Sequence, residues 1–171
     1  MARDHQERSD YNGWVSIVVR AATPRDLAEI GELAGELVRQ HHGFDAARFM
    51  LIPNVEAGYA RFFAGELSNP ETIILAAEDG EQIVGYAYAR LEGRDWNALL
   101  DAHAALHDIF VAPTARRQGV ARRLVAAVRE RAQGKGAPRL VLYTASKNQS
   151  AREFFAALGF RETMIELTAE L

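Results

Sequence analysis

The middle of the chain holds a short run of residues whose types and order suit the binding of a negatively charged group. Residues 116–121 read Arg-Arg-Gln-Gly-Val-Ala and lie between an apolar stretch that ends near Pro113 and a helical pattern. Small residues at Gly119 and Ala121 let the main chain approach a ligand, and free N–H groups at a helix N-terminus point toward an anion. The neighbouring arginines, Arg122 included, add charge-assisted hydrogen bonds. We therefore expect a diphosphate-binding turn, with an ordinary strand-to-helix connection as the alternative.

The apolar spacing on both sides of this turn predicts an alternation of strands and helices. Runs of β-branched or alternating apolar residues favour strands, and apolar stripes at steps of three and four residues favour helices. We expect strands at residues 16–22, 72–77, 82–89, 105–111, 139–144 and 160–167, and helices at 24–43, 55–67, 120–134 and 148–158. This order is typical of an α/β protein with a mixed sheet. The short apolar strand at 139–144 is expected to be buried at the centre of that sheet.

Length and composition limit the class of protein. The chain has 171 residues, 49% of them hydrophobic, which is enough for one domain at residues 14–171 after a flexible polar tail at residues 1–13. Twenty Lys and Arg against 23 Asp and Glu give a net charge of -3, which does not favour a nucleic-acid partner. There is no cysteine, and no segment has the roughly 20 apolar residues of a membrane span. We expect a cytoplasmic protein with no membrane partner and no metal.

Two motifs in the second half of the chain resemble those of the GNAT family of N-acetyltransferases. The diphosphate motif of that family is Gln or Arg, two residues, Gly, one residue, and Gly or Ala, and Arg116, Gly119 and Ala121 match it. Residues 148–160 are similar to the second signature, with Asn, Ala, aromatic residues and Gly-Phe in register. The resemblance implies an α/β fold with a mixed, mostly antiparallel central sheet of six to seven strands, about four flanking helices and a splayed central strand pair.

The resemblance also implies acetyl-CoA as the cosubstrate. It would lie between the strands at 105–111 and 139–144, with its diphosphate at the helix after Gly119 and its pantetheine arm along the backbone of residues 109–111. Asn148 would contact it from the other side. The residues that the resemblance assigns to cofactor binding are Ile109, Phe110, Val111, Arg116, Arg117, Gln118, Gly119, Val120, Ala121, Arg122, Asn148, Ala151, Phe154 and Phe155.

The general base is expected just before the diphosphate turn. In the diamine-acetyltransferase type of the GNAT family, two adjacent acids stand where His107 and Asp108 stand here. A neutral imidazole also accepts a proton at neutral pH, so the replacement preserves the chemistry. Adjacent strand residues face opposite sides of a sheet, so both reach one substrate only if a bulge reorients them. The alternatives are a structural histidine and an acid that holds neighbouring loops.

The general acid departs from the family pattern. Many members carry a tyrosine directly after the first aromatic residue of the second signature, and that position is Phe155 here. A coenzyme thiol, with a pKa of about 8.5, can still leave as a thiolate. The candidate proton donors are Tyr143, Ser146 and Ser150, with water as a further alternative.

These features predict an N-acetyltransferase that moves an acetyl group from acetyl-CoA to a primary amine of a small molecule, by direct attack in a ternary complex. The alternative is a non-catalytic coenzyme-A-binding or regulatory domain of the same fold, which Phe155 permits. The acceptor is expected to lie against the first two helices and residues 92–103. The acids available there for a cationic amine are Asp45, Glu56, Glu92, Asp95 and Asp101.

Two other groups of residues have simpler interpretations. The neighbouring His41 and His42 are typical of exposed loop residues rather than of a metal site. The expected terminal strand ends in apolar side chains that could form a homodimer contact, namely Met164, Ile165 and Leu167.

Overall fold

The central sheet carries the two candidate bases and the residues that follow them up to Val111. The computed structural model describes residues 17–169 and 171, and their strands form one sheet in the order β1-β2-β3-β4-β5. Strands β1 to β4 are antiparallel to their neighbours, whereas β5 runs parallel to β4. The expected α/β class and mixed, mostly antiparallel sheet are confirmed. The strands are β1 (Val18–Ala21), β2 (Thr72–Asp79), β3 (Gln82–Glu92), β4 (His103–Val111) and β5 (Leu140–Leu142).

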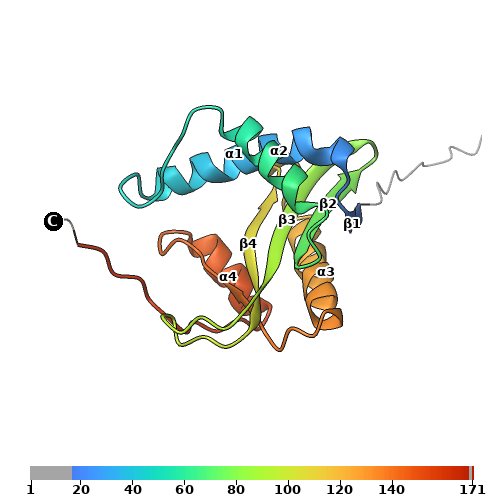
Figure 1. The fold of residues 1–171 in the computed structure, drawn as a ribbon. Helices are drawn as coiled ribbons and strands as arrows, with labels where there is room; N and C mark the ends of the chain where they lie inside the picture. The colour runs from blue at the N-terminus through green and yellow to red at the C-terminus, as the bar shows by residue number, and fades with distance from the viewer. Residues whose placement is uncertain (1–16, 170) are drawn as a thin grey trace, which may run out of the picture.

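Helices cover both faces of the sheet (Figure 1). The α-helices of the described residues are α1 (Leu27–Phe44), α2 (Val55–Glu66), α3 (Val120–Gly134) and α4 (Gln149–Ala157). Phe63 of α2 and Tyr86 of β3 belong to the apolar core on the α1 and α2 side. Leu124 of α3 and Leu75 of β2 belong to the core on the opposite side. No helix in this described part of the chain is long and apolar enough to span a membrane.

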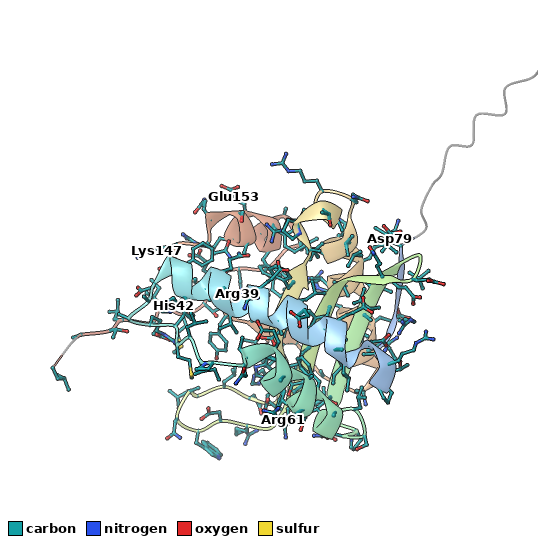
Figure 2. The ribbon with its side chains drawn as sticks, turned by 90° about the horizontal axis from the view of Figure 1, so that it is seen from above. Arg39, His42, Arg61, Asp79, Lys147 and Glu153 are labelled. Carbon is teal, nitrogen blue, oxygen red and sulfur yellow. The ribbon has the colours of Figure 1, made fainter. Side chains whose placement is uncertain are left out.

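Helices α1 and α2 approach each other closely at a glycine. A Cβ atom on Gly31 of α1 would lie 2.6 Å from the main-chain oxygen of Glu56 in α2, closer than a side chain tolerates. The carboxylate of Glu56 also pairs with Arg39 of α1. Figure 2 looks onto this face and shows α1 running across the sheet with α2 beside it. The two helices therefore form one closely packed layer.

Strand β4 contains a β-bulge that changes which side chains face which helices. Tyr88 of β3 pairs with Asp108, and the next residue of β3 pairs with Leu106, so His107 is the extra residue. Leu106 belongs to the core on the α3 side, whereas Phe110 belongs to the core on the α1 side. One extra residue shifts the alternation of a strand. Asp108, two residues before Phe110, therefore faces the α1 side.

Strands β4 and β5 separate after a short contact. They pair at three positions only, from Ala104 opposite Leu140 to Leu106 opposite Leu142. The edge of β4 at residues 107–111 therefore has no strand beside it on that side within the described residues. Apart from the Val111 oxygen, which accepts a hydrogen bond from Arg116, main-chain polar groups there are available to a ligand. This is the splay that the resemblance implies. The expectation of a buried central strand is wrong, because β5 is a half-buried edge strand.

The expected terminal strand at residues 160–167 does not form. The segment has no strand assignment and runs away from the sheet after α4 (Figure 1). The sheet of the described residues consequently has five strands rather than six to seven. The adjacent strand β5 is only three residues long and offers little edge for pairing, while an ion pair joins Glu166 to Arg48 instead. The apolar side chains of this segment are exposed, namely Met164, Ile165 and Leu167.

An ion-pair cluster holds the first described strand against the start of α1. Arg20 of β1 donates to both carboxylate oxygens of Asp26, at 2.7 and 2.9 Å, and pairs with Glu78 of β2. The hydrogen bonds from Arg20 hold the pKa of the buried Asp26 carboxyl well below its usual range. The flexible tail expected at residues 1–13 lies outside the described residues.

Candidate active site

A large cavity opens where β4 and β5 separate. Its volume is about 880 Å³, and residues of all four α-helices, both of these strands and the intervening loops contribute to it. Of the predicted site residues, those that line the cavity are His107, Asp108, Tyr143, Ile109, Phe110, Val111, Arg116, Arg117, Gly119, Val120, Ala121, Arg122, Asn148, Ala151, Phe154 and Phe155. Gln118 does not line it. Its side-chain amide instead donates to the main-chain oxygen of Thr114 at 3.1 Å.

The turn before α3 and the first residues of that helix border the cavity. Arg117 and Gly119 have positive φ angles of 63° and 81°, a backbone shape that favours glycine. The first N–H groups of a helix have no partner within the helix and carry partial positive charge. The first three residues of α3, from Val120 to Arg122, line the cavity. This end of the cavity therefore suits an anion such as a diphosphate.

Arg116 fastens this turn to the end of β4. Its Nε donates to the main-chain oxygen of Val111 at 3.0 Å, and its guanidinium group lies 5.3 Å from the centre of the Phe110 ring. Both contacts hold the side chain close to the strand. Arg116 therefore shapes the turn in addition to supplying positive charge.

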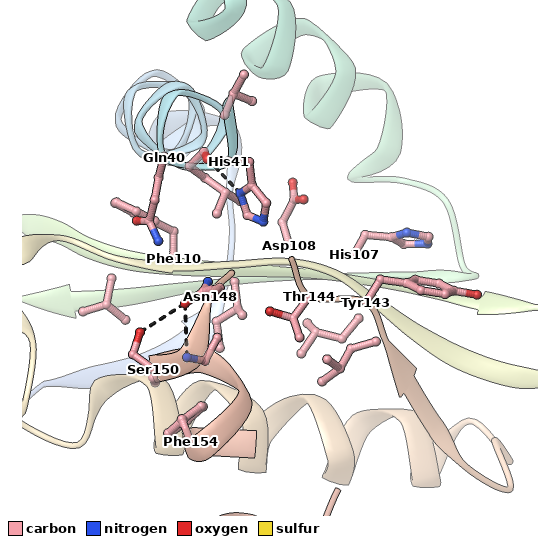
Figure 3. A pocket seen from close by; sticks show the side chains of 18 of the residues that line it. Gln40, His41, His107, Asp108, Phe110, Tyr143, Thr144, Asn148, Ser150 and Phe154 are labelled. Atoms are coloured by element: carbon pink, nitrogen blue, oxygen red, sulfur yellow. Dashed lines mark hydrogen bonds between the residues drawn. The ribbon is translucent and has the colours of Figure 1, made fainter. Parts of the chain in front are cut away.

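A second helix begins at the same side of the cavity. The Oδ1 atom of Asn148 accepts hydrogen bonds from the main-chain N–H of Ala151, at 3.2 Å, and from the hydroxyl of Ser150, at 3.1 Å (Figure 3). Asn148 is the N-cap of α4 and is buried. Its side-chain oxygen is therefore occupied by the helix that it caps.

Asp108 lies on the other side of the sheet from these helix ends (Figure 3). The hydroxyl of Tyr86 donates to its Oδ2 atom at 3.3 Å. Burial raises the pKa of the Asp108 carboxyl to about 6, against a smaller opposite effect of the Tyr86 hydrogen bond. Burial also raises the pKa of Tyr86 well above its usual range, so its phenol stays protonated and remains a donor. The carboxyl group is thus able to exchange a proton near neutral pH.

Comparison with known proteins shows to which family the chain belongs. The sequence profile of the acetyltransferase (GNAT) family matches residues 41–160, which is more than half of the chain. The chain belongs to the GNAT family. It is an acetyl-CoA-dependent N-acetyltransferase, as the two sequence motifs predict.

Relatives of this GNAT enzyme are known from sequence. The uncharacterized N-acetyltransferase YhfO of Bacillus subtilis (strain 168) is 31% identical over 105 residues, which cover 61% of this chain and 69% of that protein. The aminoglycoside N(6')-acetyltransferase type 1 of Klebsiella aerogenes is 32% identical over 104 residues, which cover 60% of this chain and 68% of that protein. Both matches therefore span about two thirds of the relative.

Solved structures share the GNAT fold of the chain. An aminoglycoside N-acetyltransferase in complex with CoA has a TM-score of 0.75 at 22% identity, over 91% of this chain and 95% of that one. The aminoglycoside 6'-N-acetyltransferase of Acinetobacter baumannii has a TM-score of 0.72 at 22% identity, over 91% of this chain and 98% of that one. At this identity, the likeness establishes the fold.

The two candidate bases of the GNAT site have different surroundings. His107 lines the cavity, but its Nε2 atom lies 3.2 Å from Oε1 of Glu92 and its ring stacks on Tyr88 with centroids 5.4 Å apart. Its side chain is 40% exposed, and Figure 3 shows it directed away from Asp108. The bulge thus lets both side chains reach the cavity, although only Asp108 is held by a buried donor.

The leaving-group side of the GNAT site is poor in proton donors. Phe155 is buried and packs between Phe154 and Phe160, with ring centroids 5.1 and 5.4 Å away. It belongs to the apolar core, where it offers no proton. Tyr143 lines the cavity just after β5 and is exposed. Thr144 and Ser150 line the cavity as well, although the Ser150 hydroxyl donates to Asn148, whereas Ser146 is not part of the lining.

Sequence reasoning missed His41. The residue belongs to the last turn of α1 and lines the cavity, so its interpretation as an exposed loop residue is wrong. Its Nδ1 atom lies 2.9 Å from the main-chain oxygen of Leu37, and its ring lies near Asp108 in Figure 3. The sequence did hold a signal for this position. His41 lies four residues after Leu37, and this spacing places both side chains on the same face of α1. Within residues 17–169 and 171, no three His, Asp or Glu side chains gather to hold a metal ion.

Proposed function

We propose that this GNAT enzyme acetylates a primary amine of a small molecule by direct attack in a ternary complex with acetyl-CoA. The observation that supports this most strongly is one continuous cavity that joins the anion-binding turn to the carboxylate of Asp108. A diphosphate at residues 117–122 and a pantetheine arm along residues 109–111 bring the thioester to the place where β4 and β5 separate. The amine then approaches from the α1 side, where Asp108 lies.

Asp108 is the proposed general base. An alkyl amine has a pKa of about 10.4 and is mostly protonated at neutral pH, so it must lose a proton before it attacks. A carboxyl group with a pKa of about 6 is mostly ionised at pH 7 and is a stronger base than an ordinary aspartate. Tyr86 holds this carboxylate in position. His107, which lines the same cavity, is the second candidate for this role.

The bond changes follow from this placement. Asp108 first takes a proton from the ammonium group and releases it to solvent. The neutral amine nitrogen then forms a bond to the thioester carbon, one of its two remaining protons passes to Asp108, and the carbon–sulfur bond breaks with both electrons on sulfur. The developing oxyanion lies beside the open edge of β4, where main-chain N–H groups of residues 109–111 can stabilise it. The thiolate takes a proton from water or from Tyr143, which is exposed and lines the cavity.

Initial-rate kinetics test this proposal. Direct attack requires both substrates to be bound together, so double-reciprocal plots at several fixed amine concentrations should intersect. Intact-mass measurement after incubation with acetyl-CoA alone should show unmodified protein. Parallel plots with an acetylated protein would exclude direct attack. Binding of acetyl-CoA without acetylation of any amine would instead favour the non-catalytic alternative for this chain.

A further inference from the structure

Apolar side chains form the acceptor end of the cavity. They come from the end of α1, from residues 45–54 and from the start of α2, and they include Leu37, Phe49, Met50, Ile52, Val55 and Tyr59. Met50 and Ile52 are 77% and 51% exposed although they are large and apolar. Contiguous exposed apolar surface beside a cavity is typical of a ligand-binding wall.

The acids expected to bind a cationic amine are not in this wall. Glu56 pairs with Arg39, Asp101 pairs with Arg94, and Glu92 lies beside His107. None of these three carboxylates lines the cavity.

Two more expected acids also lie outside the lining. Asp45 accepts hydrogen bonds from the main-chain N–H groups of residues 47 and 48, and Asp95 accepts from those of residues 97 and 98. Among the described residues, Asp108 is the one carboxylate that lines the cavity. The acceptor end thus offers a single negative charge.

The other charged group at this end disfavours a second cation. Arg48 lines the cavity, lies 5.1 Å from the centre of the Phe49 ring and pairs with Glu166. His41 also lines it, and its imidazole ring offers no negative charge. An additional ammonium group on the acceptor would lose hydration here without gaining a carboxylate partner.

We propose that the acceptor is a primary amine with one positive charge on an apolar body, rather than a polycationic amine. This inference rests on the proposed function. The ammonium group binds at Asp108, and the aliphatic or aromatic remainder lies on the wall formed by Phe49, Met50, Ile52 and Tyr59. Burial of such a body strengthens binding by roughly ten- to a hundredfold, and the same wall gives no compensation to further ammonium groups.

A matched pair of amines tests the inference directly. Hexylamine and hexamethylenediamine have the same chain length but carry one and two ammonium groups. With saturating acetyl-CoA, kcat/KM for hexylamine should exceed that for the diamine by roughly tenfold, and 2-phenylethylamine should exceed spermidine and neamine by at least as much. Equal or reversed ratios, with measurable turnover, would overturn the inference and leave the proposed function intact.

A pair of variants locates the discrimination in the wall. Met50→Glu places a carboxylate in the lining and should reduce the preference for hexylamine over the diamine by about tenfold. Leu51→Glu is the control, because Leu51 is 48% exposed and is not part of the lining. An unchanged ratio in Met50→Glu, or the same change in both variants, would contradict this location. If acetyl-CoA binds and no amine is acetylated, the proposed function fails and this inference fails with it.

Discussion

The two ends of the cavity are built from different parts of the polypeptide. The proposed cofactor end is built largely from main-chain groups of one short stretch, from the edge of β4 to the first turn of α3, with residues of α4 beside it. The acceptor end consists of side chains from α1, residues 45–54 and α2. A site made of backbone requires small residues and particular φ angles, which leave a local sequence pattern. A site made of distant side chains leaves no such pattern.

The largest expected effect concerns Asp108, which lies where the two ends meet. Asp108→Asn removes the proposed base and should lower kcat/KM by about a thousandfold, while acetyl-CoA affinity, measured by calorimetry, stays unchanged. Because the ionised carboxylate is the active form, wild-type kcat/KM should fall about tenfold per unit as the pH drops below about 6. Normal turnover in Asp108→Asn would transfer the role to another group, with His107 the next to test.

The second largest expected effect is a loss of acetyl-CoA affinity after a substitution at the cofactor end. Gly119→Glu imposes a side chain on a residue with a φ of 81° and adds a negative charge beside the diphosphate turn. Acetyl-CoA affinity should fall by about a hundredfold, which is about 2.7 kcal/mol. Gly134→Glu, at the opposite end of α3, has open space around it and serves as the control. Equal affinity in the two variants would remove the diphosphate from this turn.

A smaller effect is expected on stability and on the KM for the amine after a substitution at the acceptor end. Gly31→Ala introduces a Cβ atom 2.6 Å from the main chain of α2 and should separate the two helices. We expect a loss of about 2 kcal/mol in the free energy of unfolding and a higher KM for the amine. Acetyl-CoA affinity should not change. The control is Gly65→Ala in α2, where nothing lies near the added atom. A change in cofactor affinity alone would contradict the separation of the two ends.

The smallest effect concerns stability at the junction of the two ends. The pKa of Asp108 is about 6 in the folded state and about 3.9 in an unfolded chain, so the folded state holds its proton more tightly. Folding stability contributed by this group is therefore lost as the pH rises from about 4 to 6. Asp108→Asn should raise the free energy of unfolding by about 1 kcal/mol at pH 7.5 and by less at pH 4. Thermal unfolding at both pH values measures this difference.

The contrast between the ends also explains what the sequence could predict. The turn before α3 depends on residues close together in the chain, so the sequence could predict it, whereas the separation of β4 from β5 was expected only from the family resemblance. The role of Tyr86 as partner of Asp108 depends on the pairing of β3 with β4, which spacing alone does not reveal. Glu56 was expected to face the acceptor, but it pairs with Arg39 because α1 and α2 pack so closely.

The missing terminal strand has a related cause. An apolar, β-branched pattern at residues 160–167 shows that the segment is able to form a strand, but a strand also needs a neighbouring edge. Strand β5 ends at Leu142, and so the edge that such a strand would need is short. Edge length depends on the whole sheet and is not encoded in the segment itself.

The extra residue of β4, His107, lies at a point of the strand that borders the sites proposed for both substrates. A bulge bends its strand and increases local twist, and pairing with β5 stops at Leu106, immediately before His107. The register shift and the end of the β5 pairing therefore fall at the same point of β4, so one irregular position borders both the amine side and the thioester side of the cavity.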